Sequence, residues 1–143
     1  MIFIAHRGNL HGENNLENNP LFVDKALRLG YNVEVDVWKI DDNFFLGHDK
    51  PEYEVEKEFL FNKSFWCHAK NLESLRWMLD NDVRCFWHQE DDFTLTSDNI
   101  IWTYPGKQVT SRSVVVCKNL EDSIEYSKMD VYGICSDYVG ELR

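Results

Sequence analysis

The fold of this chain is decided by the stretch Asn32-Val33-Glu34-Val35-Asp36-Val37-Trp38. Its strict alternation of apolar and polar residues is typical of a β-strand, in which successive side chains point to opposite faces. The valines share the face that suits packing against helices, and Glu34 and Asp36 share the other. These carboxylates lie about 6–7 Å apart along the strand, so they repel each other unless a cation or a proton separates them. An exposed edge strand with solvated acids is the alternative interpretation.

Other segments of the chain also have the composition of strands or helices, and no linker or low-complexity tract separates them. Strands are predicted at Ile2–His6, Asn32–Trp38, Ser64–Lys70, Arg84–Gln89, Ile100–Tyr104, Ser113–Lys118 and Tyr132–Asp137, and Phe44–His48 is predicted to pair with the end of the second strand. Helices are predicted at Pro20–Leu29, Leu72–Asn81 and Leu120–Ser127.

An internal repeat indicates how these elements are arranged. The segment Lys70-Asn71-Leu72-Glu73-Ser74-Leu75 resembles Lys118-Asn119-Leu120-Glu121-Asp122-Ser123-Ile124, with a strand ending in lysine and an asparagine placed to cap the next helix. A repeated strand and helix favours a parallel α/β architecture. A complete eight-fold barrel needs about 250 residues. We therefore expect one domain over residues 1–143, an abbreviated (β/α) barrel of about seven strands with several helices shortened or missing; a small doubly wound sheet is the alternative.

Composition limits the classes of function. The chain has 143 residues and a net charge of −10, which disfavours nonspecific binding to nucleic acid or to anionic lipid. Its first apolar run is too short for a signal peptide or a membrane anchor. We therefore expect a cytoplasmic protein whose four cysteines are reduced and pack as small apolar side chains.

Several polar side chains are predicted to meet near the carboxyl ends of the strands, where β/α barrels place their sites. His68 and Lys70 share one face of the third strand, although a lone strand histidine is more often a satisfied core residue. A pair of histidines, here His6 and His48, can serve as general acid and base at neutral pH. Arg7 and Lys70 are suited to neutralising phosphate oxygens.

Four motifs occur in an order that resembles a known family. They are His6-Arg7-Gly8, Glu17-Asn18-Asn19, Glu34-Val35-Asp36-Val37 and Gly47-His48-Asp49. Together they resemble the glycerophosphodiester phosphodiesterase family, whose members fold as TIM barrels. The segment Gly133-Ile134-Cys135-Ser136-Asp137-Tyr138 also resembles the closing strand of that family. The likeness covers about the first fifty residues and this last segment.

The resemblance implies a role for each matching residue. It implies that His6 and His48 are the acid/base pair, Glu34 and Asp36 hold a divalent cation, Arg7 contacts phosphate, Glu17 supports the metal, and Lys70 is the lysine of a strand motif. His68 stands where the family has a third metal-binding glutamate. We expect Mg²⁺ or Ca²⁺, with Mn²⁺ or Zn²⁺ as alternatives because an imidazole ligand favours softer metals.

The resulting hypothesis is a metal-dependent phosphodiesterase that hydrolyses a small glycerophosphodiester-like substrate. Two alternatives remain open: a phosphate-binding module of this fold without turnover, and a lyase that forms a cyclic phosphate. A homodimer is also left open, because a barrel without some of its helices exposes apolar surface.

Overall fold

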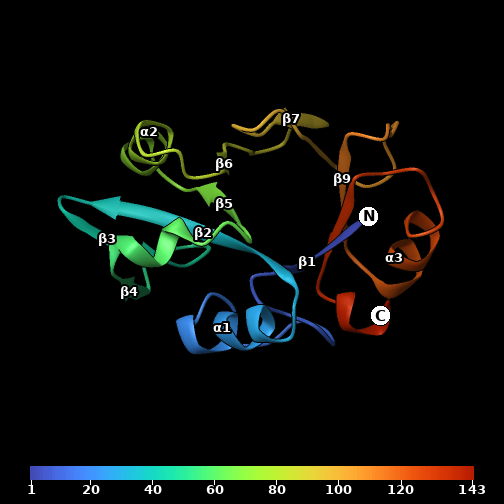
Figure 1. The fold of residues 1–143 in the computed structure, drawn as a ribbon, viewed down its shortest axis with the longest axis horizontal. Helices are drawn as coiled ribbons and strands as arrows, with labels where there is room; N and C mark the ends of the chain where they lie inside the picture. The colour runs from blue at the N-terminus through green and yellow to red at the C-terminus, as the bar shows by residue number, and fades with distance from the viewer.

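The structure is a computed structural model that describes residues 1–143 (Figure 1). Its strands are β1 (Ile2–His6), β2 (Asn32–Ile40), β3 (Asn43–Leu46), β4 (Tyr53–Val55), β5 (Phe65–Ala69), β6 (Cys85–Phe86), β7 (Phe93–Leu95), β8 (Ile101–Thr103), β9 (Ser113–Cys117) and β10 (Gly133–Ser136). Its helices are α1 (Pro20–Arg28), α2 (Leu72–Asp80) and α3 (Leu120–Tyr126), with short 3₁₀ turns at Lys57–Phe61 and Val139–Glu141.

Strand β2 has the two faces that its sequence predicts. The three valines are fully buried and pack against Val23 and Ala26 of α1 in the largest core cluster. Glu34 and Asp36 point to the opposite face, and neither is more than 2% exposed. The alternative of an edge strand with solvated acids is therefore wrong, because β2 is paired on both sides, with β1 and with β5.

The ten strands form one curled, mixed sheet. Parallel ladders join β6 to β5, β5 to β2, β2 to β1, β1 to β10, β10 to β9 and β9 to β8. Antiparallel ladders add β3 and β4 beyond the end of β2, and β7 beside β8. The first and last strands of the chain are therefore neighbours, and the carboxyl ends of the parallel strands meet at one edge of the sheet.

The expectation of a barrel is wrong. The sheet stays open between β6 and β8, which form no ladder, so it is a half-barrel with only three short helices. The reason is local: the predicted strand Arg84–Gln89 is reduced to the two residues of β6, and the chain then forms β7. Side chains bridge the gap instead, because Phe86 stacks on Trp102 with ring centroids 4.4 Å apart.

The helices lie on the outside of the curl, where Figure 1 shows α1, α2 and α3 surrounding the sheet. The expected asparagine caps are present: Asn71 accepts a hydrogen bond from the Ser74 amide at 3.1 Å, and Asn119 accepts one from the Asp122 amide at 2.8 Å. Since all three helices pack on the outer face, the doubly wound alternative is also wrong. None of the helices is both long and apolar enough to cross a bilayer.

The inner face of the sheet is apolar over most of its height. Trp66, Phe86 and Trp102 fill it together with aliphatic side chains from β1 and β9. All four cysteines are buried in the core clusters, as expected for small apolar side chains. The polar residues at the carboxyl ends of the strands therefore lie on top of a packed apolar layer.

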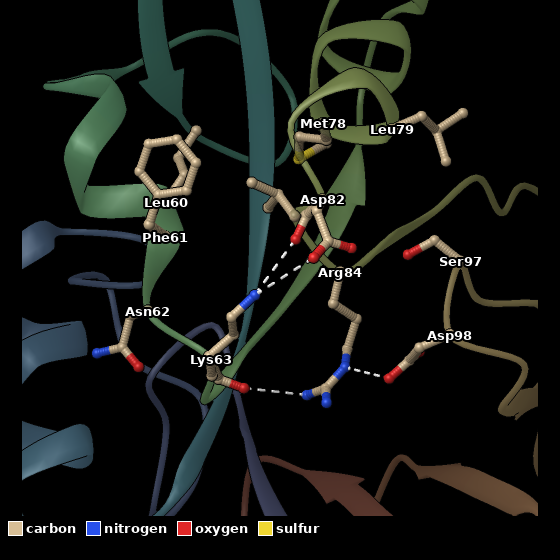
Figure 2. Close-up of a pocket in the computed structure, with 11 residues that line it drawn as sticks. Leu60, Phe61, Asn62, Lys63, Met78, Leu79, Asp82, Arg84, Ser97 and Asp98 are labelled. Atoms are coloured by element: carbon tan, nitrogen blue, oxygen red, sulfur yellow. Dashed lines mark hydrogen bonds and ion pairs between the residues drawn. The ribbon is translucent and has the colours of Figure 1, made fainter.

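The opposite, amino-terminal end of β5 and β6 is closed by Arg84. A pocket of about 290 Å³ lies at this end, and Figure 2 shows Arg84 beside Asp98 and Lys63. Arg84 Nε lies 2.6 Å from Asp98 Oδ2, and its Nη1 donates to the Lys63 carbonyl at 3.2 Å. The guanidinium lies over the ring of Trp66, 4.1 Å from its centroid. Arg84 is therefore engaged in closing the core, whereas Lys63 and Asp82 form an exposed ion pair at the edge of the pocket.

Replacing Arg84 with alanine is expected to lower the free energy of unfolding by about 1–3 kcal/mol, because it removes a cation–π contact and charge-assisted hydrogen bonds. Urea denaturation measures this change. Arg76→Ala is the matched control: its ion pair with Asp80 is exposed on α2, so its effect should stay within about 0.5 kcal/mol. Equal effects of the two substitutions would contradict the role of Arg84.

Candidate metal and phosphate site

A cavity of about 550 Å³ opens at the carboxyl edge of the parallel strands. This volume lies within the range of about 300–1,000 Å³ that is common for small-molecule sites. Six residues singled out from the sequence line it: His6, Arg7, Glu34, His48, His68 and Lys70. The two others, Asp36 and Glu17, lie directly behind this wall and contact Arg7.

Three side chains from β2 and β5 point at one another at the wall of this cavity. The ladder pairs Asp36 with His68, and His68 Nδ1 lies 3.3 Å from Asp36 Oδ1 and 3.8 Å from Glu34 Oε1. One donor atom from each of the three residues falls within 4.8 Å of the others. The structure therefore brings the predicted ligand set together.

The hydrogen bonds of His68 determine which of its nitrogens faces the carboxylates. His68 Nε2 lies 2.9 Å from the carbonyl oxygen of His88, which can only accept, so Nε2 carries the proton and donates. In the neutral ring the lone pair is then on Nδ1. The ring is also stacked on Phe86, with centroids 5.1 Å apart. A backbone carbonyl that fixes the tautomer in this way is typical of metal-binding histidines.

Two carboxylate oxygens of this group lack partners. Glu34 Oε2 and Asp36 Oδ1 are buried and accept no hydrogen bond, an arrangement that costs free energy unless a cation compensates it. Burial and the neighbouring Asp36 raise the pKa of Glu34. Burial also acts to raise the pKa of Asp36, but His68 and Arg7 outweigh it and lower that pKa. Two carboxylates and one imidazole nitrogen form a donor set that fits a divalent cation.

Asp36 is held in place by residues from the loop before α1. Asn18 donates from Nδ2 to Asp36 Oδ2 at 2.9 Å and accepts from the Asp36 amide at 3.0 Å. Arg7 Nε lies 3.1 Å from the same oxygen. Oδ2 is therefore occupied by Asn18 and Arg7, while Oδ1 faces His68.

Arg7 reaches Asp36 because its backbone turns sharply after β1. Its φ angle is +54°, a left-handed conformation that is uncommon for a residue with a side chain. Its Nη1 donates to Glu17 at 3.2 Å. Burial lowers the pKa of Arg7, but Glu34 and Asp36 outweigh it and raise that pKa. Glu17 therefore contacts Arg7, which lies between it and the acid pair.

His6 belongs to a second polar pair, with Asp137 from the segment after β10. Nδ1 lies 2.8 Å from Asp137 Oδ1, and because the ionised carboxylate only accepts, Nδ1 donates and Nε2 faces the cavity. Nε2 is 3.9 Å from Glu34 Oε2. Burial lowers the pKa of His6, but Asp137 and Glu34 outweigh this and raise it. Such a pair can accept a proton at Nε2 and stabilise the resulting imidazolium.

His48 lies at the rim of the cavity, where its side chain is 43% exposed. The loop that carries it is tied to β2: the Gly47 amide donates to the Asp36 carbonyl at 3.1 Å, and Trp38 Nε1 donates to the Gly47 carbonyl at 2.7 Å. A Cβ at position 47 would lie 2.0 Å from the Lys50 carbonyl, so only glycine fits. Nδ1 of His48 pairs with Asp49 at 2.8 Å.

Lys70 follows β5 and lines the same wall as His68. Its backbone amide donates to the Val37 carbonyl at 2.9 Å, which fixes it next to the end of β2. It is in none of the ion pairs of the structure, so its ammonium is free to meet an anion.

Sequence reasoning missed three residues of this site. Asn18 and Asp137 were seen within motifs but were given no function, and Asn9 was not considered. Asn9 is fully buried, and its Nδ2 lies 2.8 Å from both Glu17 and Asp137. The run of polar residues directly after β1 was the available signal, since such a run is costly to bury without partners.

The site therefore combines a cation-type donor set, a histidine–aspartate pair and free positive charge in one cavity. No family model, curated protein or solved structure matches the chain.

Proposed function

We propose that this protein is a metal-dependent phosphodiesterase that hydrolyses a glycerophosphodiester-like substrate. One observation carries the proposal: His68 Nδ1 and two carboxylate oxygens without hydrogen-bond partners converge at the wall of the cavity that the His6–Asp137 pair also lines. The order of the motifs, which resembles the glycerophosphodiester phosphodiesterase family, supports the same chemistry.

The residues divide into three tasks in this proposal. Glu34, Asp36 and His68 hold one divalent cation, which supplies Lewis-acid polarisation of a phosphoryl oxygen when bound. Lys70 and the outer edge of Arg7 hold the remaining phosphate oxygens. His6 Nε2 accepts the proton of the nucleophile, and Asp137 stabilises the imidazolium that results. His48, at the rim, donates a proton to the departing alkoxide.

The substrate is a small molecule in this proposal, and nucleic acid is disfavoured by the net charge of −10. The proposal also places the activity in the cytoplasm. The four cysteines support this location, because each is a free, buried thiol.

The test is hydrolysis of glycerophosphocholine by the purified protein with Mg²⁺, Mn²⁺ or Ca²⁺, followed by ³¹P NMR. We expect glycerol 3-phosphate as product, loss of turnover with a chelator, and recovery when the metal is added back. His11→Ala is the control, because His11 pairs with Glu141 outside the cavity. Accumulation of a cyclic phosphate would identify a lyase instead. Binding of glycerol 3-phosphate without turnover in any metal would identify a binding module.

A further inference from the structure

The cavity has a second wall that the proposed reaction does not use. It is formed by residues after β6 and β8 and at the end of β9, across the open side of the sheet from β2. From this wall His88, Gln89, Tyr104 and Lys118 line the cavity, and none of its lining residues is acidic. Three carboxylates line the rest of the cavity: Glu13 and Glu34 come from the other side, and Asp137 follows β10, which is paired with β9.

Lys118 is held over this wall by Tyr104. Its Nζ lies 4.5 Å from the centroid of the Tyr104 ring and contacts the phenol oxygen. Lys118 forms no ion pair in the structure, so its charge has no carboxylate partner. In a chain of net charge −10, Lys70 and Lys118 are two lysines without acidic partners that face one cavity from different strands.

His88 lies next to Tyr104 on this wall. Its Nδ1 is buried and has no hydrogen-bond partner. The His88 ring lies 6.4 Å from the Tyr104 ring, centroid to centroid, and its carbonyl orients His68. The His88 ring, the Tyr104 phenol and the Lys118 ammonium thus lie together on this wall of the cavity.

We propose that Lys118, with Tyr104 and His88, forms a second anion-binding position, and that the substrate carries a further anionic group on its alcohol substituent. The statement about the substrate rests on the proposed function, whereas the anion-binding position does not. The group recognised is a carboxylate or a second phosphate, since both accept hydrogen bonds from an ammonium and a phenol.

Binding of three matched probes, measured by calorimetry with Mg²⁺ present, tests the position without requiring turnover. The probes are propyl phosphate, 1,3-propanediol bisphosphate and 3-(phosphonooxy)propanoate. Two of these probes carry a second anionic group. We expect the wild type to bind at least one of these two about tenfold more tightly than propyl phosphate. The probe that gains more identifies phosphate or carboxylate as the group recognised.

Lys118→Gln should remove this preference and leave the affinity for propyl phosphate unchanged. Tyr104→Phe should remove part of it. Lys128→Gln is the control, because it deletes the same charge from an exposed lysine near the end of α3 and should keep the preference. Equal binding of all probes by the wild type, or an unchanged preference in Lys118→Gln, would overturn the proposal.

Hydrolysis separates this inference from the proposed function. Glycerophosphoserine and glycerophosphoethanolamine differ by one carboxylate, and Lys118→Gln should lower the ratio of their kcat/KM values about tenfold. Absence of turnover together with a probe preference that depends on Lys118 would reject the phosphodiesterase and keep the anion-binding position. Turnover together with a probe preference and a kcat/KM ratio that are both independent of Lys118 would keep the phosphodiesterase and reject the position.

Discussion

Replacing Glu34 with glutamine is expected to weaken divalent-cation binding at least about 100-fold, since even residues that only support metal ligands change affinity by 10- to 100-fold. The substitution keeps the shape of the side chain and removes one of the two buried charges that face His68. Calorimetric titration with Mn²⁺ measures the loss. Hydrolysis, where the wild type shows it, should fall to the level seen with a chelator.

Two further measurements distinguish a loss of metal binding from misfolding of the Glu34→Gln variant. Without metal, Glu34→Gln should unfold at the same temperature as the wild type or higher, because a buried acid with a partnerless oxygen is removed. Adding Mn²⁺ should stabilise the wild type and leave the variant unchanged. Glu13→Gln, an exposed acid on the same cavity wall, should bind the metal as the wild type does. Unchanged affinity in Glu34→Gln would contradict the assignment of the metal site.

The alternation of side chains between the two faces of a strand made part of this site predictable from the sequence. The alternation in β2 correctly separated the valines from Glu34 and Asp36, and the same rule placed His68 on the inner face of β5. This alternation predicts the faces correctly because a central strand cannot shift its register by one residue without exposing its valines. The asparagine caps were predictable for a similar reason, since they depend on residues only three positions apart.

The closure of the sheet depends on contacts that no short pattern contains. The segment Arg84–Gln89 reads as a strand, yet only Cys85–Phe86 form one, because Trp87 is directed outward and Thr94 donates to its carbonyl instead. The stack of Phe86 on Trp102 then bridges the gap as packing rather than as a ladder. Whether strands of this length close a barrel is decided by such long-range packing.

The supporting residues escaped prediction because their partners are far away in the chain. Asp137 meets His6 across 131 positions, and Asn9 meets the same carboxylate across 128. Both contacts follow from the parallel ladder between β1 and β10, which pairs the first strand with the last. Once that ladder is known, polar residues directly after the two strands are bound to meet.

The histidine–aspartate pair yields the second large expected effect. Replacing His6 with alanine should lower kcat for diester hydrolysis by about 10²–10⁴-fold, the usual contribution of a general acid or base. Affinity for Mn²⁺ should change little, because Nε2 of His6 lies 3.9 Å from Glu34 and outside the donor set. A loss of kcat with intact metal binding therefore separates proton transfer from metal binding.

Asp137→Asn tests whether Asp137 acts through His6. The carboxylate accepts from Nδ1 and raises the pKa of His6 against the effect of burial, so in metal-free protein the asparagine variant should show a lower His6 pKa by NMR titration. Its kcat should fall less than that of His6→Ala, and the double variant should be no slower than His6→Ala alone, because residues that act as a unit are not additive. If the reductions in kcat of the two single variants multiplied in the double variant, Asp137 would not act through His6 and would only stabilise the fold. An unchanged His6 titration in Asp137→Asn would mean that the carboxylate does not hold the imidazole in the orientation proposed.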